Sequence, residues 1–247
     1  MIAALPMYDR PQTAAANDRL WQGMRVALGY GPESLSRDGD LWEIWQSPDL
    51  LLAQTCGYPF RTRLHPHVQL VGTPVLALPN CPPGQYCSVI VIRADDPRDT
   101  PEAFAAAPFA YNEALSQSGW AAPQNWAAAR GFSFTNPVQT GAHRASAMAV
   151  AEGRADIAAI DALTWDILRA HDRFTDGLRV LARTDPTPAL PYITARDRDP
   201  APLFDALQTA IGALTQDDRT TLGITGVIRL PATDYLAVPN PPPPPPN

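Results

Sequence analysis

The sequence contains no lysine: all 19 of its basic residues are arginine, against 25 acidic residues, for a net charge of −6 over 247 residues. The arginines are scattered along the chain and form no cluster. Proteins that bind nucleic acid usually gather basic residues on one face or along one helix. The sequence therefore predicts no nucleic-acid partner. An acidic chain can still bind a small anion, because a local group of hydrogen-bond donors decides that contact.

Cysteine is also rare, and occurs only as Cys56, Cys81 and Cys87. Three cysteines make neither a disulfide framework nor a zinc site of four. Cys81 and Cys87 flank the segment CPPGQYC, where a turn would bring them close enough to pair in an oxidising compartment; otherwise they stay reduced. His65 and His67 lack a second cluster of His or Cys with which to hold a metal. We expect neither a metal nor a cofactor.

Long apolar runs are missing too. No stretch approaches the roughly 20 apolar residues that cross a bilayer as a helix, so we do not expect an integral membrane protein. The first residues, MIAALPMYDRPQ, lack the basic start and long apolar stretch of a secretory signal. The sequence leaves two locations open, the cytoplasm or an exported protein whose signal is not among these residues.

The sequence does contain an alternation of apolar strands and amphipathic helices, which is typical of an α/β protein. Its length fits two lobes of about 100 residues each. We expect a first lobe from residues 1–90 and 187–238 and a second lobe from residues 91–186, with a ligand between them. The proline-rich tail, residues 239–247, is expected to be disordered, with a linker end or a partner-docking peptide as the alternatives.

The spacing of apolar residues predicts the individual elements. Pro123 would cost a hydrogen bond beyond the first turn of a helix, so the helix that follows Ser118 either begins later or is kinked. Runs without polar alternation, such as residues 87–94, are expected to be strands buried on both faces. The expected strands are residues 2–6, 50–55, 68–78, 87–94, 108–112, 134–140, 155–161 and 178–184, and the expected helices are residues 16–28, 141–153, 162–171, 199–214 and 215–224.

Two clusters of small polar residues stand where a strand ends and a helix begins. The first is Ser116, Gln117 and Ser118, and the second contains Thr140 and His143. A helix N-terminus presents unpaired N–H groups and the positive end of the helix dipole, and both favour an oxyanion. Hydroxyl groups add hydrogen bonds without adding charge. The alternative for each cluster is simple helix capping, for which serine is a favoured residue.

Three titratable residues accompany these clusters. His143, in the first turn of its helix, is driven toward the neutral form unless an anion holds it protonated. Arg144 in the same turn is unfavourable by about 0.3–1 kcal/mol, so it either pairs with an acid or contacts an anionic ligand. Asp161 closes the apolar segment ADIAAID. It either caps the following helix or accepts a hydrogen bond from a ligand.

Other strand ends offer an opposite wall for a ligand. Tyr8 and Asp9 follow the first strand, and Thr55, Gly57 and Tyr58 follow the strand LLLAQT. Aromatic rings there can pack on an apolar part of a ligand while their hydroxyl groups bind an oxygen.

Catalysis has little support in the sequence. A trio of Cys56, His143 and Asp161 could in principle serve as nucleophile, base and orienting acid, but no local nucleophile signature accompanies it. We expect a binding protein rather than an enzyme.

Seven segments, in order over residues 3–196, resemble the substrate-binding proteins of phosphate, phosphite and phosphonate ABC transporters: IAALPMYD, DLLLAQTCGYPF, VQLVGTPV, YCSVIVIRADD, NEALSQSGW, VQTGAHRASAMAVAEGRADIAAIDALTW and RVLARTDPTPALPYITA. The motifs SQSG and TGAHRAS followed by GRADIAAID are the most specific. The resemblance implies a type II periplasmic-binding fold, in which two α/β lobes, each a mixed sheet flanked by helices, close by a hinge on an oxyanion.

The resemblance also implies roles for individual residues. The phosphoryl oxygens would be held by Ser116, Gln117, Ser118, Thr140 and His143. Asp161 would accept a proton from the ligand, and Tyr8 and Tyr58 would close from the first lobe. The implied ligand-binding residues are Tyr8, Tyr58, Ser116, Gln117, Ser118, Thr140, His143 and Asp161. The implied function is capture of a small oxyanion and its delivery to an ABC permease. A cytoplasmic enzyme or ligand sensor on the same two-lobe fold stays as the alternative, because fold does not fix function.

Overall fold

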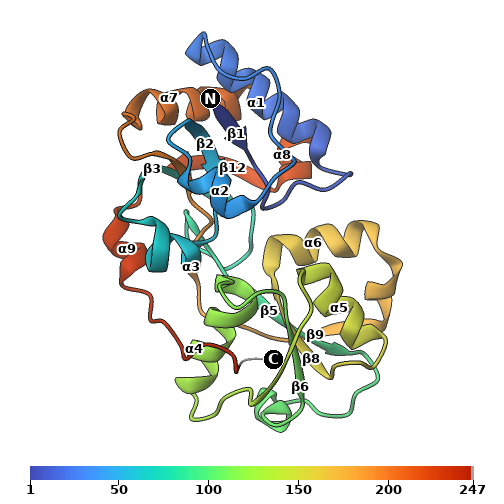
Figure 1. Cartoon of the computed structure of the whole chain (residues 1–247). Coiled ribbons are helices and arrows are strands. Elements are labelled where there is room, and N and C mark those ends of the chain that lie inside the picture. Colours follow the sequence, from blue (N-terminus) through green and yellow to red (C-terminus); the bar gives the residue numbers. More distant parts are fainter. Residues whose placement is uncertain (246–247) are drawn as a thin grey trace. The chain divides into compact units, whose positions relative to one another are not determined.

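The computed structural model describes residues 1–245 and divides the chain into two compact units (Figure 1). Unit 1 consists of residues 1–85 and 188–237, and unit 2 of residues 86–187 together with the tail from residue 238. The chain thus passes between the units three times. The first boundary lies after residue 85 rather than after residue 90. Strands β4 (Gln85–Tyr86) and β10 (Thr187–Pro188) form a separate two-stranded sheet at the first two boundaries.

Unit 1 is built on a mixed sheet with the strand order β1-β2-β11-β3-β12. β1 and β2 are parallel, β11 runs antiparallel to both β2 and β3, and β12 runs antiparallel to β3. The elements of this unit are β1 (Ile2–Ala4), α1 (Ala14–Leu28), α2 (Leu41–Gln46), β2 (Leu50–Gln54), α3 (Gly57–Pro59), the π-helix η1 (Phe60–Leu64), β3 (Val68–Leu76), β11 (Tyr192–Ala195), α7 (Ala201–Ala213), α8 (Gln216–Leu222), β12 (Ile224–Ile228) and α9 (Ala232–Leu236).

Helices cover both faces of this sheet, because successive strand residues point to opposite sides. Ala3 packs into a core that includes buried residues of α1 and α7, whereas Ala4 packs into a second core with residues of α2, η1 and α9. Trp21 and Met24 lie on the buried face of α1, as the spacing predicts.

Unit 2 is built on a second mixed sheet, with the order β7-β6-β8-β5-β9. β5 is buried from Ser88 to Ile92, with Val89 and Ile92 inaccessible to solvent, as its continuous apolar run predicts. The elements of this unit are β5 (Ser88–Arg93), the 3-10 helix η2 (Pro101–Phe104), β6 (Pro108–Tyr111), the π-helix η3 (Gln117–Ala121), α4 (Ala122–Ala128), β7 (Asn136–Gln139), α5 (His143–Ala151), β8 (Ile157–Asp161), α6 (Ala162–His171), the 3-10 helix η4 (Arg173–Gly177) and β9 (Leu178–Arg183). Both units therefore have the expected α/β architecture.

The direction of the unit 2 strands brings the expected polar clusters to one edge of the sheet. β6 runs parallel to both β7 and β8, so all three end at the same edge. β5 is antiparallel to β8, and its first residue, Ser88, pairs with the last residue of β8, Asp161. We call the edge where β6, β7 and β8 end and β5 begins the carboxyl edge. Polar groups at such an edge of an α/β sheet are well placed to bind a ligand.

Pro123 is accommodated by a change in helix type. The π-helical turn η3 comes first, and Pro123 then stands in the first turn of α4. The amides of Ala121 and Ala122 donate five residues back, to Ser116 and Gln117, so the next acceptor in this ladder is the carbonyl of Ser118. Proline cannot donate to it, and Ser88 Oγ donates instead at 2.8 Å. The chain therefore loses no hydrogen bond at this carbonyl.

The tail differs from the disordered segment that its composition predicts. The carbonyl of Pro239 accepts a hydrogen bond from Asn125 Nδ2 at 2.8 Å, and the carbonyl of Pro242 accepts one from Trp120 Nε1 at 3.0 Å. The last two residues of the expected tail, at positions 246 and 247, lie outside the described residues.

The cysteines resolve an alternative that the sequence leaves open. No disulfide joins Cys81 and Cys87, and Cys87 is buried.

Candidate functional site

The turn at the start of η3 is held by its own first serine. Ser116 is the N-cap, and its Oγ accepts a hydrogen bond from the Gly119 amide at 3.0 Å. Ser116, Gln117 and Ser118 are all buried. Gln117 Nε2 donates to Thr187 Oγ1 at 3.3 Å. The capping interpretation therefore holds for Ser116, while the other two side chains point elsewhere.

Ser118 and His143 are brought together by the carboxyl edge. Ser118 Oγ and His143 Nε2 are 2.8 Å apart, within hydrogen-bond distance. The first residue lies in η3 and the second begins α5, so a single hydrogen bond joins the two predicted clusters. The hydrogen bond from Ser88 to the Ser118 carbonyl ties the same turn to the start of β5.

His143 is held in its neutral form. Burial lowers the pKa of the ring from 6.5 to about 4, and the nearby carbonyl of Ala159 acts in the opposite direction. The ring atom Nδ1 is buried and makes no hydrogen bond of ordinary geometry within residues 1–245. In a neutral imidazole one nitrogen donates and the other accepts. With the proton on Nδ1, toward the Ala159 carbonyl, Nε2 accepts from the Ser118 hydroxyl; with the proton on Nε2, the ring donates to Ser118 Oγ and leaves the hydroxyl hydrogen available for an anion.

We expect the His143 ring of the ligand-free protein to stay uncharged down to about pH 5, because protonation would place a charge in a buried position. Below pH 6.5 the unfolded chain binds a proton that the folded chain does not, so the free energy of unfolding falls until about pH 4. Nitrogen-15 NMR of the imidazole, assigned with His143→Gln, measures the midpoint directly. A midpoint near 6.5 would contradict the burial argument.

The hydroxyl group of Thr140 makes its hydrogen bonds within the protein. Its Oγ1 lies 3.0 Å from the carbonyl of Tyr111, 3.2 Å from that of Ala142 and 2.6 Å from Ser146 Oγ. One hydroxyl offers a single donor, so these internal acceptors use the hydrogen that a ligand would need. Thr140 fastens the loop between β7 and α5, and the buried Ser146, which the sequence did not single out, completes that contact.

Asp161 caps helix α6, and it lies at the carboxyl edge. Its Oδ1 accepts a hydrogen bond from the Thr164 amide at 2.9 Å at the start of α6. The residue is 2% exposed, and its backbone pairs with Ser88. A carboxylate has about four acceptor positions, so the cap alone does not exclude a ligand donor at Asp161.

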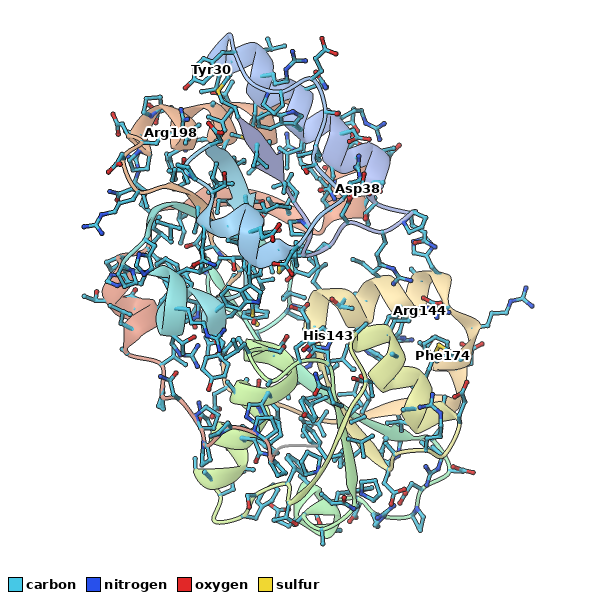
Figure 2. All side chains as sticks on the ribbon, viewed as in Figure 1. Tyr30, Asp38, His143, Arg144, Phe174 and Arg198 are labelled. Atoms are coloured by element: carbon cyan, nitrogen blue, oxygen red, sulfur yellow. The ribbon has the colours of Figure 1, made fainter. Side chains whose placement is uncertain are left out.

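Arg144 pairs with an acid. Its Nε lies 2.9 Å from Asp172 Oδ1, and its guanidinium lies over the ring of Phe174, 5.5 Å from the centroid. Figure 2 shows Arg144 beside Phe174 and His143 at the start of the same helix. The first of the two alternatives for Arg144 is therefore the one found.

Gly119 and Asn112 are two residues of this site that sequence reasoning missed. A Cβ on Gly119 would lie 1.8 Å from Asn112 Oδ1, so any larger residue here would require the Asn112 side chain to move. Asn112 Oδ1 is buried and has no hydrogen-bond partner in the described part of the chain. Gly119 belongs to the motif SQSG, but nothing in the sequence indicates how closely it approaches Asn112.

Tyr8 and Tyr58 belong to unit 1. Tyr8 is 8% exposed and follows β1, and its carbonyl accepts a hydrogen bond from Thr13 Oγ1. Tyr58 lies in α3 with the Arg61 guanidinium 4.4 Å from its ring centroid. Both side chains thus follow strands of their own sheet, as the sequence predicts.

Residues 1–245 contain neither a cluster of metal ligands nor a membrane-spanning helix. No group of three or more His, Cys, Asp or Glu side chains is arranged to hold a metal ion. Within the same residues, no helix combines the length and apolar character needed to cross a bilayer.

Comparison with known proteins identifies one family model, described as the periplasmic substrate-binding protein of the phosphonate ABC transporter, which matches residues 49–235. No curated protein matches the chain.

Solved structures with the same fold include three instructive ones. The binding protein component of an ABC phosphonate transporter from Pseudomonas aeruginosa is 16% identical, with a TM-score of 0.72 over 92% of this chain and 80% of that one. PhnD1 from Prochlorococcus marinus in complex with methylphosphonate is 14% identical, with a TM-score of 0.74 over 95% and 94%. A histidine kinase sensor domain similar to periplasmic binding proteins is 17% identical, with a TM-score of 0.61 over 98% of both chains. At these identities the structures establish the fold alone.

Proposed function

The chain belongs to the periplasmic substrate-binding proteins of phosphonate ABC transporters, and from this we propose that it binds a phosphonate or a closely related oxyanion at the carboxyl edge of the unit 2 sheet. The observation that carries the proposal is the 2.8 Å contact between Ser118 Oγ and His143 Nε2. It places a hydroxyl group at the start of one helical segment beside the first turn of another.

The donors of the proposed site are neutral. The first-turn amides of α5 lie outside its hydrogen-bond ladder and at the positive end of its dipole. His143 is uncharged, and Arg144 is paired with Asp172. An oxyanion would thus be held by amide hydrogens, the Ser118 hydroxyl and the helix dipole, without a free cation. Thr140 would act as a positioning residue, because its hydroxyl is already engaged.

Asp161 would select the protonation state of the ligand. A carboxylate repels a fully ionised oxyanion but accepts a hydrogen bond from a P–OH group. A singly protonated phosphonate satisfies this acceptor, whereas sulfate carries no proton at neutral pH. We therefore propose that Asp161 favours phosphonates over sulfate.

The remaining roles follow from the family. Tyr8 and Tyr58 are proposed as further ligand residues on the resemblance to the family alone, since an aromatic ring can pack on an apolar substituent. Gln117 would contact a phosphoryl oxygen. We propose that the protein acts without catalysis and delivers its ligand to the permease of an ABC transporter.

A thermal-shift screen tests the proposed ligand class. Methylphosphonate, phosphate, phosphite, sulfate and acetate are added separately to the purified full chain, and isothermal titration calorimetry follows for each hit. At equal ligand concentrations we expect methylphosphonate to stabilise the protein most. A concentration of 100 times its Kd would raise the free energy of unfolding by about 2.7 kcal/mol. Stabilisation by acetate or sulfate but not by methylphosphonate would contradict the proposal. Chemical conversion of a bound compound would point to the enzyme alternative.

A further inference from the structure

The proline-rich tail lies against η3, the turn that contains Ser118, and against α4 (Figure 1). Pro239 and Pro242 supply the carbonyl acceptors, and Asn125 and Trp120 supply the donors. Pro241, between the two acceptors, is buried. The tail is separated from these donors by 114 and 122 residues of sequence, so the contact is tertiary and not a local turn.

The spacing of the two contacts matches a polyproline helix. Such a helix has three residues per turn and rises about 3.1 Å per residue, so carbonyls three positions apart point the same way about 9 Å apart. Pro239 and Pro242 have this spacing. Their donors are five positions apart, Trp120 in η3 and Asn125 in α4, and they reach the two carbonyls at 3.0 and 2.8 Å. Two side chains can therefore meet two carbonyls on one side of the tail.

The chemistry of the contact is the one that proteins use to recognise polyproline. A polyproline helix has no internal hydrogen bonds, so its carbonyls remain available, and its fixed backbone loses little entropy on docking. Aromatic grooves recognise such segments. Trp120 offers an indole N–H that can only donate, and its ring packs on Tyr111 at 5.0 Å between centroids. The donor is thereby fixed in place before the tail meets it.

We propose that residues 239–245 are an intrachain polyproline ligand, which docks on Trp120 and Asn125 and braces the π-helical turn η3. Trp120 stands two residues after Ser118, so the brace acts on the turn that carries this serine. The docking does not depend on what the turn binds. Its failure would leave the proposed function standing, and a failed ligand screen would leave the brace standing.

The test compares four full-length proteins by NMR: the native chain, Asn125→Asp, Asn136→Asp, and a variant with Pro241 to Pro245 all replaced by glycine. Asn125→Asp turns a donor toward the Pro239 carbonyl into an acceptor of the same shape. Asn136 is exposed, so Asn136→Asp is the control that adds the same charge to the same unit. Two signals are read, the backbone order of Asn240 from its heteronuclear NOE and the hydrogen exchange of the Trp120 indole N–H.

We expect Asn240 to be as ordered as the sheets in the native chain and in Asn136→Asp. In Asn125→Asp and in the glycine variant it should become mobile, and exchange of the Trp120 indole N–H should rise about tenfold, because one or both docking contacts are lost. A synthetic peptide PNPPPPPPN should restore slow exchange in the glycine variant. A mobile Asn240 in the native chain, or indole exchange that is equal in all four proteins, would overturn the proposal.

Discussion

Replacing Ser118 by alanine is expected to weaken phosphonate binding by about 10- to 150-fold. The proposed site holds its ligand with neutral donors, so the loss of a hydroxyl removes a hydrogen bond to a charged group, which contributes about 1.5–3 kcal/mol. The backbone of the turn should stay in place, because the Ser118 carbonyl keeps its hydrogen bond from Ser88. Isothermal titration calorimetry with methylphosphonate measures the loss.

The matched control is Thr175→Val. Thr175 is also buried in unit 2, and its Oγ1 donates to the Asp172 carbonyl at 2.8 Å. It lies just before Leu178, which pairs with Arg93 at the opposite end of β5 from the carboxyl edge. Both variants should lose about 1 kcal/mol of stability without ligand, since each removes one hydrogen bond. Equal affinity for methylphosphonate in the two variants would show that Ser118 is only structural.

Asp161→Asn is expected to change the selectivity of the site. Asparagine caps a helix as well as aspartate does, so its side-chain oxygen can still accept from the Thr164 amide and α6 should remain intact. The variant loses the charged acceptor for a ligand P–OH group, so methylphosphonate affinity should fall about 10- to 150-fold. The new amide N–H can face an unprotonated oxygen, so sulfate should bind more tightly than to the native protein.

Asp40→Asn provides the comparison for this change. Asp40 is an exposed N-cap in unit 1, where its side chain accepts from the amides of Trp42 and Glu43, and the same substitution there keeps the cap. Titrations of methylphosphonate and sulfate with both variants give the ratio of the two affinities. An unchanged ratio in Asp161→Asn would exclude a role for this carboxylate in selecting protonated ligands.

The sequence predicted the framework of unit 2 well because its strands are short, apolar and separated by clear helix starts. Each polar cluster follows a strand whose direction could be inferred, so the approach of Ser118 to His143 was foreseeable from topology. The strand β12 was missed, because Ile224–Ile228 contains Thr225 and Gly226 and merges with the preceding helical pattern. The helix α2 is six residues long and carries too few turns for a period to show.

Long-range partners were beyond sequence reasoning. Nothing near Arg144 indicates that Asp172 would pair with it, and Thr140 gives no sign that its hydroxyl is used by Tyr111 and Ser146. The proline tail could be assigned a conformation but not a binding site, since its donors lie more than a hundred residues away. The sequence could not show that the α-helix begins later than Ser118, at Ala122, because no residue pattern predicts the π-helical turn that precedes it.

The division of the chain into units sets an order of events during synthesis on the ribosome. The whole unit 2 sheet comes from one uninterrupted stretch, residues 86–187. In unit 1, β3 must wait for β11 and β12, which pair with it on both sides and emerge later. All strands of the second sheet are therefore synthesised while β1, β2 and β3 still lack β11, so the half of the protein made first is the half whose sheet can be completed last.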